Sequence, residues 1–139
     1  MVKKFTLGSK ERLKSRKLID QVFAEGKNFN AFPFRVYYLF SSGKWPIGGS
    51  GLLQCGVGVS TRNFKHSVDR NRIKRLTREA YRQQKNELQE LIFGKDCSMA
   101  IFLIYTGREL PDYGAVTEKI GLILNRLIKA AHEIPSSAS

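Results

Sequence analysis

The spacing of apolar residues predicts a helix near the start of the chain, from about Ser15 to Glu25. Ser15 can cap its first turn, and Gly26 is expected to end it in a left-handed conformation. The apolar stripe of this helix consists of Leu18, Ile19, Val22 and Phe23.

From Phe29 to Phe40 the pattern changes to alternation, which predicts a strand with two distinct faces. One face carries Phe34, Val36, Tyr38 and Phe40, and the other carries Arg35, Tyr37 and Leu39. Pro33 lacks a backbone donor and is expected at a strand start or edge. A hairpin loop is predicted over Ser41–Gly51, with strands following over about Leu52–Ser60 and over Ser98–Thr106.

Two helices complete the pattern: a basic helix from about Ser67 to Phe93, before Gly94, and a last helix after the loop Gly107–Pro111. The last helix has one apolar face, formed by Val116, Ile120, Ile123, Leu127 and Ala131. The order α-β-β-(β)-α-β-α, with the bracketed strand optional, indicates an α+β fold, a two-layer α/β sandwich. We expect a basic N-terminal arm at 1–14, a single domain at 15–132 and a flexible tail at 133–139.

The length of 139 residues suits one domain with its own hydrophobic core. Cys55 and Cys97 lie far apart in apolar segments, which indicates reduced core thiols in a cytoplasmic protein. The two histidines, His66 and His132, have no ligand spacing to these cysteines, so no metal site is expected. No apolar run approaches the roughly 18 residues of a membrane span.

Charge adds a functional indication, because the net charge of +12 is concentrated in two segments. Residues 1–17 carry +6 and residues 62–85 carry +7, while the rest of the chain sums to −1. Two dense basic segments and a pI near 10.0 are typical of a protein that binds a polyanion, most often nucleic acid.

The second basic segment forms a stripe on the predicted basic helix. At about 100° per residue, Arg75, Arg78 and Arg82 fall within an arc of about 60°. The cations on this side are Lys74, Arg75, Arg78, Arg82 and Lys85, and the apolar residues opposite are Ile73, Leu76 and Ala80. Because guanidinium groups bind phosphate oxygens bidentately, the stripe favours nucleic-acid binding over a merely solvated cationic face.

The sequence contains no recognisable active site of its own. No nucleophile has an adjacent base, and the carboxylates Asp69 and Glu79 lie among arginines. Glu109 and Asp112 flank a loop without making a two-metal site. Three classes of protein remain: an accessory subunit of a ribonucleoprotein enzyme, a ribosome- or RNA-associated binding module without enzymatic association, and, least favoured, a self-sufficient metal-dependent nuclease.

The segment from Phe64 to Arg82 resembles the protein subunit of bacterial ribonuclease P. It contains Arg70-Asn71-Arg72 followed by Lys74-Arg75 and Arg78-Glu79-Ala80. The resemblance continues in Glu11–Arg16, in Val22–Gly26 and from Ser98 to Lys129. The connection Ser60–Lys65 departs from the family's usual Ser-Lys-Lys before a glycine-containing turn, and Thr61 replaces one basic position.

This resemblance implies a fold of the ribosomal protein S5 domain 2 type, with a left-handed β-α-β crossover that the usual right-handed rule would not predict. It also implies that a catalytic RNA with bound Mg²⁺ removes the 5′ leader from precursor tRNA. The protein would then hold no catalytic residue and no metal ligand. We expect a monomeric protein in a 1:1 complex with ribonuclease P RNA.

The resemblance also assigns two sets of RNA-binding residues. The catalytic RNA would be contacted by Arg70, Asn71, Arg72, Lys74, Arg75, Arg78 and Arg82. The leader of precursor tRNA would be bound by Phe23, Tyr37, Arg62, Lys65, Arg12, Lys14 and Arg16. Helical periodicity alone favours burial of Phe23, whereas Tyr37 shares a strand face with Arg35, which favours partial exposure. Arg12, Lys14 and Arg16 are expected either in a disordered arm or on leader phosphates.

Overall fold

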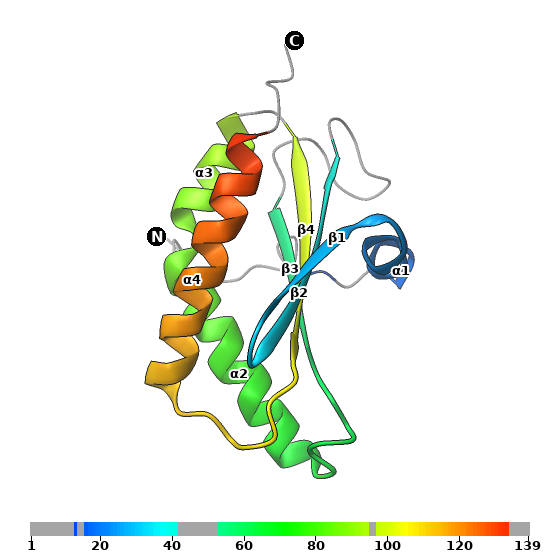
Figure 1. Ribbon diagram of the computed structural model, residues 1–139, viewed down its shortest axis with the longest axis vertical. Coiled ribbons are helices and arrows are strands. Elements are labelled where there is room, and N and C mark those ends of the chain that lie inside the picture. Colours follow the sequence, from blue (N-terminus) through cyan, green and yellow to red (C-terminus); the bar gives the residue numbers. More distant parts are fainter. Residues whose placement is uncertain (1–12, 14–15, 42–52, 95–96, 134–139) are drawn as a thin grey trace, which may run out of the picture.

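The computed structural model describes residues 13, 16–41, 53–94 and 97–133 of the chain (Figure 1). These residues form four helices and four strands. None of the helices in the described residues is long and apolar enough to cross a membrane. The elements are α1 (Arg16–Glu25), β1 (Lys27–Ala31), β2 (Phe34–Ser41), β3 (Leu53–Val59), α2 (Ser67–Gln84), α3 (Asn86–Gly94), β4 (Ser98–Tyr105) and α4 (Tyr113–His132).

The four strands form one sheet in the order β1-β2-β4-β3. β1 and β2 are antiparallel and meet at the turn Phe32–Pro33, so the predicted single strand from Phe29 to Phe40 is a hairpin, with Pro33 just before β2 as expected. β4 pairs with β2 antiparallel and with β3 parallel. The predicted hairpin between β2 and β3 is wrong, because β4 lies between these strands; the loop itself, 42–52, lies outside the described residues.

The sheet separates two apolar layers, and the two faces that the alternation predicted for β2 point into different layers. Phe34 and Val36 point into the main core beneath α2, α3 and α4, where the apolar face predicted for the last helix is fully buried. On the opposite face α1 packs through Leu18 and Val22 against Ala100 and its neighbours. Figure 1 shows the three helices on one side of the sheet and α1, nearly end-on, on the other.

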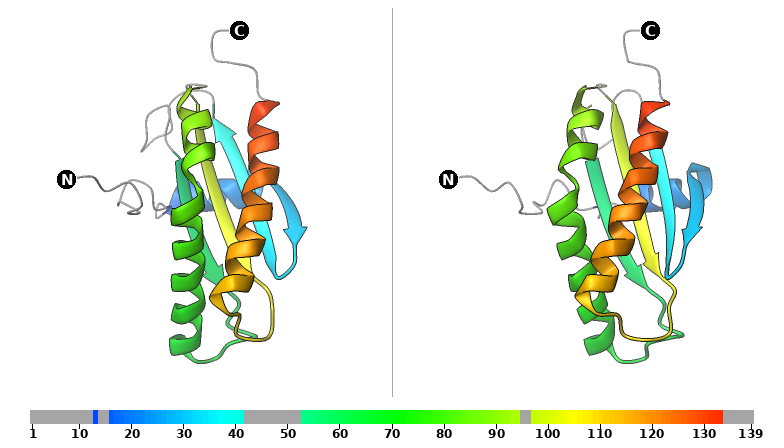
Figure 2. Two further views of the ribbon diagram at one scale, coloured as in Figure 1. Left: turned by 90° about the vertical axis from the view of Figure 1, so that its left-hand side faces the viewer. Right: turned by 60° about the vertical axis from the view of Figure 1, so that its left-hand side comes forward.

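The connection from β3 to β4 makes a left-handed crossover. Seen from the helical side with these strands running downward, the chain leaves β3, rises in front of the sheet through α2 and α3, and descends in β4 to the right of β3 (Figure 2). The right-handed rule covers nearly all β-α-β units, so this unusual topology confirms the expectation that came from the family resemblance.

Two helix ends differ from the sequence prediction. The basic helix does not continue to Phe93, because it breaks at Lys85 between α2 and α3. Lys85 is only 2% exposed, and its Nζ donates a hydrogen bond to Gln89 Oε1 at 3.0 Å, so its predicted place on the basic stripe is wrong. Gly26 follows α1 without a left-handed φ; a Cβ there would lie 2.5 Å from the carbonyl oxygens of Val22 and Tyr38. Glycine allows this close backbone approach.

Candidate nucleic-acid interface

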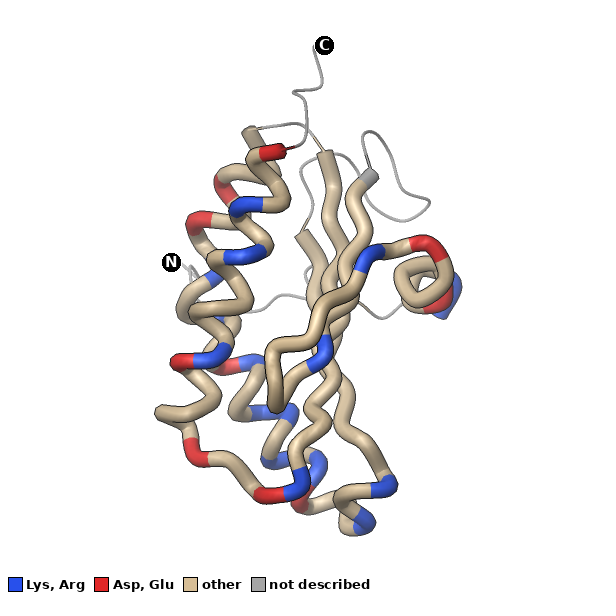
Figure 3. The backbone as a smooth tube through the Cα atoms, viewed as in Figure 1, with Lys and Arg blue, Asp and Glu red and all other residues tan. Residues whose placement is uncertain are grey.

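The exposed side of α2 carries the densest positive charge of the described residues. Asn71, Arg72 and Arg75 are exposed, and Lys74 and Arg78 are half-buried, while Ile73 and Ala80 on the opposite side enter the core. Figure 3 shows cations along α2 and along the connection that precedes it. A rigid helix therefore holds several guanidinium groups toward solvent, with aliphatic side chains fixing its orientation.

Two of the predicted RNA-binding arginines also have partners within the protein. Arg70 donates from Nη1 to the carbonyl oxygens of Phe64 and Lys65, each at 2.8 Å, and so fixes the turn before α2. Arg82 forms an ion pair with Glu79 one helical turn earlier. Hydrogen bonds from Arg82 and then from Gln83 hold the pKa of Glu79 below its ordinary value. Arg72 and Arg75 are therefore better placed than Arg82 to meet an external phosphate.

The connection from β3 to α2 presents Arg62 and Lys65, both exposed. It is held by the buried ring of Phe64 and by Asn63, whose Nδ2 donates to the carbonyl oxygens of Thr106 at 3.2 Å and Gly107 at 3.3 Å. The altered connection is thus anchored to the loop after β4, and it keeps two cations beside the N-terminal end of α2.

Arg78 marks where α2 approaches the edge of the sheet. Its charge lowers the pKa of the Cys55 thiol on β3, although desolvation by burial dominates and raises that pKa to about 12. Cys55 and Cys97 are both buried free thiols, as predicted. α2 packs beside edge strand β3, where the second candidate site begins.

The second site is an aromatic cluster on the α1 side of the sheet. Phe23 on α1 stands edge-on to Tyr37 on β2, with ring centroids 4.7 Å apart, and lies 5.2 Å from the ring of Phe102 on β4. Phe23 is 40% exposed, so the burial that periodicity favoured does not occur. The structure thus brings together the two aromatic residues assigned to leader binding and adds a third.

The sheet register arranges the floor of this cluster in two rows that cross all four strands. The first row is Gly56, Phe102, Tyr37 and Asn28, and the second is Gly58, Ile104, Arg35 and Asn30. The Phe102 ring lies against β3, because a Cβ on Gly56 would be 2.9 Å, and one on Gly58 3.1 Å, from its ring atoms. Because both glycines lack a side chain, β3 adds no side chain of its own to the surface beside Phe102.

Arg35 gives the aromatic cluster a cation. Its guanidinium lies 5.8 Å from the Tyr37 ring centroid, and its Nη2 donates to Asn28 Oδ1 at 3.0 Å. Sequence reasoning missed Arg35, Phe102 and the two glycines as site residues. The strand alternation placed Arg35 beside Tyr37, and the two-residue glycine spacing was visible, but only the order of the strands could bring these residues together.

The remaining assigned residues divide into two groups. Arg16 is exposed at the start of α1, on the same face of the sheet as the aromatic cluster. Arg12 and Lys14 lie outside the described residues.

Within the described ranges no group of three His, Cys, Asp or Glu residues could hold a metal ion.

A basic helix beside an aromatic, cation-lined surface on a small α+β sandwich is typical of a class of protein, the RNA-binding domains in which cations contact phosphates and aromatic rings stack on unpaired bases. Comparison with known proteins identifies the family within this class. The family model described as Ribonuclease P matches residues 7–128. The chain therefore belongs to the ribonuclease P family, as a protein component of the bacterial enzyme.

Individual relatives agree with this assignment. The ribonuclease P protein component of Porphyromonas gingivalis is 37% identical over 134 residues, which cover 96% of this chain and 93% of that protein. That of Chlorobium phaeobacteroides is 27% identical over 129 residues, 88% of each chain. The solved RNase P protein of Staphylococcus aureus shares the fold, with a TM-score of 0.62 at 19% identity over 84% of this chain and 94% of that one.

Proposed function

We propose that the chain assists RNA-catalysed removal of the 5′ leader from precursor tRNA, as a monomeric subunit bound 1:1 to ribonuclease P RNA in the cytoplasm. The observation that supports this proposal is that the cationic helix α2 and the aromatic, cation-lined surface of the α1 face both adjoin the edge strand β3. An RNA subunit on α2 and a single strand on the α1 face would then be neighbours.

The first part of the proposal assigns the RNA subunit to α2. Arg72 and Arg75 would bind backbone phosphates, with Asn71, Lys74, Arg78 and Arg82 at the border and Arg70 fixing the adjoining turn. Phosphate contacts fix register and orientation without reading sequence. A helix held by a large core is suited to this task because its charges keep their spacing when the RNA binds.

The second part assigns the leader to the aromatic cluster. Tyr37, Phe102 and the exposed part of Phe23 offer ring faces and edges to unstacked bases, and Arg35 offers charge to the backbone. Stacking on an aromatic side chain is worth about 1–3 kcal/mol per base and tolerates sequence change. Such a surface suits a leader whose sequence differs from one precursor to the next. Arg62, Lys65 and Arg16 would contact phosphates at its borders.

The third part concerns chemistry. The protein supplies positioning and positive charge, and the RNA subunit performs phosphodiester hydrolysis with its own Mg²⁺. The described residues contain neither a nucleophile–base pair among the site residues nor a cluster of metal ligands, so no step is assigned to a side chain of this chain. Cations near the RNA would instead reduce repulsion between phosphates that approach one another.

Reconstitution tests the proposal. Purified protein is added to ribonuclease P RNA and precursor tRNA at low Mg²⁺, where we expect the protein to restore cleavage at the mature 5′ end. Protein alone and RNA alone serve as controls. Failure to restore cleavage would favour a binding module without enzymatic association, and cleavage by protein alone would identify a self-sufficient nuclease.

A further inference from the structure

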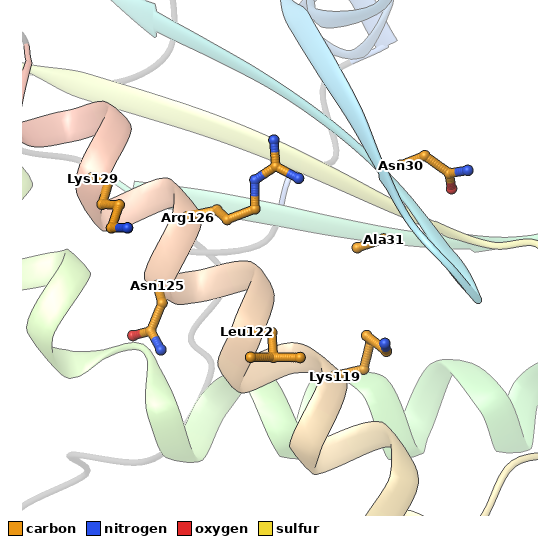
Figure 4. Close-up of a pocket in the computed structure, with 7 residues that line it drawn as sticks. All are labelled: Asn30, Ala31, Lys119, Leu122, Asn125, Arg126 and Lys129. Atoms are coloured by element: carbon orange, nitrogen blue, oxygen red, sulfur yellow. The ribbon is translucent and has the colours of Figure 1, made fainter.

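A basic groove lies between α4 and edge strand β1, on the face of the sheet opposite the aromatic cluster. It has a volume of about 440 Å³ and is lined by Asn30, Ala31, Lys119, Leu122, Asn125, Arg126 and Lys129. Figure 4 shows the Arg126 side chain extending from α4 toward the sheet, with Ala31 on β1 across from it and the Asn30 side chain pointing away from α4. The lining contains three cations and no acidic residue.

The chemistry of this groove matches single-stranded nucleic acid. The Arg126 guanidinium carbon lies 4.0 Å from the centroid of the Phe29 ring, which holds the guanidinium in place over β1. Leu122, 53% exposed, adds an apolar surface between the cations. Proteins that hold single strands combine cations that follow the backbone with flat or apolar groups that contact bases.

The aromatic cluster and this groove are connected around the β1 edge. The two rows of the α1 face end at Asn28 and Asn30 on β1, opposite Tyr37 and Arg35. Asn30 also lines the groove on the other face. Neighbouring β-strands are about 4.8 Å apart. Tyr37 and Arg35 therefore lie one β-strand spacing from the sheet edge around which a bound RNA would pass.

The position of α2 gives this path a direction. α2 packs against β3, at one edge of the sheet, and β1 is the opposite edge. A leader that starts beside the RNA subunit at β3 and follows the rows of the α1 face leaves the sheet at β1. Its nucleotides farthest from the cleavage site therefore arrive at Asn28 and Asn30, and then at the groove.

We infer that the groove between α4 and β1 binds the distal, single-stranded nucleotides of a long 5′ leader, as a continuation of the aromatic cluster. This inference rests on the proposed binding of the leader at that cluster. The groove would contribute nothing to a short leader that ends on the α1 face, so it makes affinity depend on leader length.

The test compares precursor tRNAs with leaders of about 4 and about 16 nucleotides, lengths that span the usual site sizes of single-strand-binding domains. Holoenzyme is assembled with Arg126→Gln, Lys129→Gln or, as matched control, the exposed Arg108→Gln. For the long leader we expect each groove variant to lower affinity on the order of 5-fold and to reduce the salt dependence by about 0.7 in log K per log salt. The short leader and the Arg108 control should be unchanged.

The outcomes separate this inference from the proposed function. If Tyr37→Ala weakens both leaders and the groove variants weaken neither, the groove inference is wrong and the leader site stands. If Tyr37→Ala weakens neither leader, the leader site itself is wrong. Equal losses of the groove variants for both leaders, or a loss for the RNA subunit without precursor, would place another RNA in the groove and overturn the inference. Because Arg126 also contacts Phe29, Lys129→Gln keeps the test valid if Arg126→Gln disturbs the hairpin.

Discussion

The basic side of α2 and the aromatic cluster on the α1 face are two candidate binding sites that are built from different parts of the fold. α2 is one continuous element, and its charges are spaced by the helix itself. The cluster takes residues from α1 and from every strand of the sheet. In the proposed function the first site binds phosphates, which look alike in every RNA, and the second binds bases, which need a shaped surface.

This difference predicts different responses to mutation. On α2 the cations other than Arg70 and Arg82, which have partners within the protein, are expected to contact RNA nearly independently, so their losses should add and should respond strongly to salt. In the cluster the rings contact one another, so a change in one residue should alter the others, and salt should matter less. Each variant below is designed to affect one of the two sites and spare the other.

The largest effect is expected from Arg75→Ala combined with Arg78→Ala. Hydrogen bonds to charged groups are worth about 1.5–3 kcal/mol each, and about 1.4 kcal/mol is tenfold in affinity, so two lost contacts should weaken binding of ribonuclease P RNA by at least about 100-fold. Affinity for an isolated leader oligonucleotide should change much less. Filter binding of the two RNAs over a range of salt concentrations measures both, and equal losses for the two RNAs would contradict the separation of the sites.

Tyr37→Ala tests the aromatic cluster. Loss of one stacking platform should reduce the preference for precursor over mature tRNA by about 1–3 kcal/mol, while binding of the RNA subunit is retained. Tyr37→Phe is the matched control, because it keeps the ring and should keep the preference. Competition binding between precursor and mature tRNA gives the result, and an unchanged preference in Tyr37→Ala would remove Tyr37 from the leader site.

The two sites also differ in how far the sequence could predict them. The stripe on α2 follows from helical spacing alone, and Ile73 and Ala80 are buried opposite Arg75 as predicted. The same reasoning wrongly placed Lys85 on the stripe, because a periodic pattern does not show where a helix breaks.

The cluster depends on long-range pairing, which the periodicity of a single segment cannot provide. The contact between Phe23 and Phe102 and the position of Gly56 beside Phe102 arise only once β4 is inserted between β2 and β3. The family resemblance supplied Phe23 and Tyr37 as an assignment, and the crossover as a topology. Neither follows from the residues themselves, because local pattern carries no information on strand order.

Gly56→Ala examines the floor of the cluster with the smallest possible change. The added methyl group would lie 2.9 Å from the Phe102 ring, so the ring must shift, and we expect the free energy of unfolding to fall by about 1 kcal/mol with weaker leader binding. Gly94→Ala is the control, because nothing lies within 4 Å of its added methyl group. Denaturant unfolding and leader binding are measured together, and an unaffected leader affinity would show that the position of the Phe102 ring is unimportant.

The smallest effect is expected at the C-terminal end of α2, from Arg82→Gln compared with Arg75→Gln. Arg82 is paired with Glu79, whereas Arg75 is exposed, so Arg82→Gln should weaken binding of the RNA subunit less. A partly exposed ion pair contributes about 0–1 kcal/mol to folding. Because the pKa of Glu79 is lowered in the folded protein, this contribution is present at neutral pH and is lost as the pH falls through that pKa. Wild-type and Arg82→Gln proteins should therefore differ slightly in thermal stability at pH 7 and converge in acid. A loss of RNA affinity equal to that of Arg75→Gln would show that Arg82 leaves Glu79 to bind phosphate.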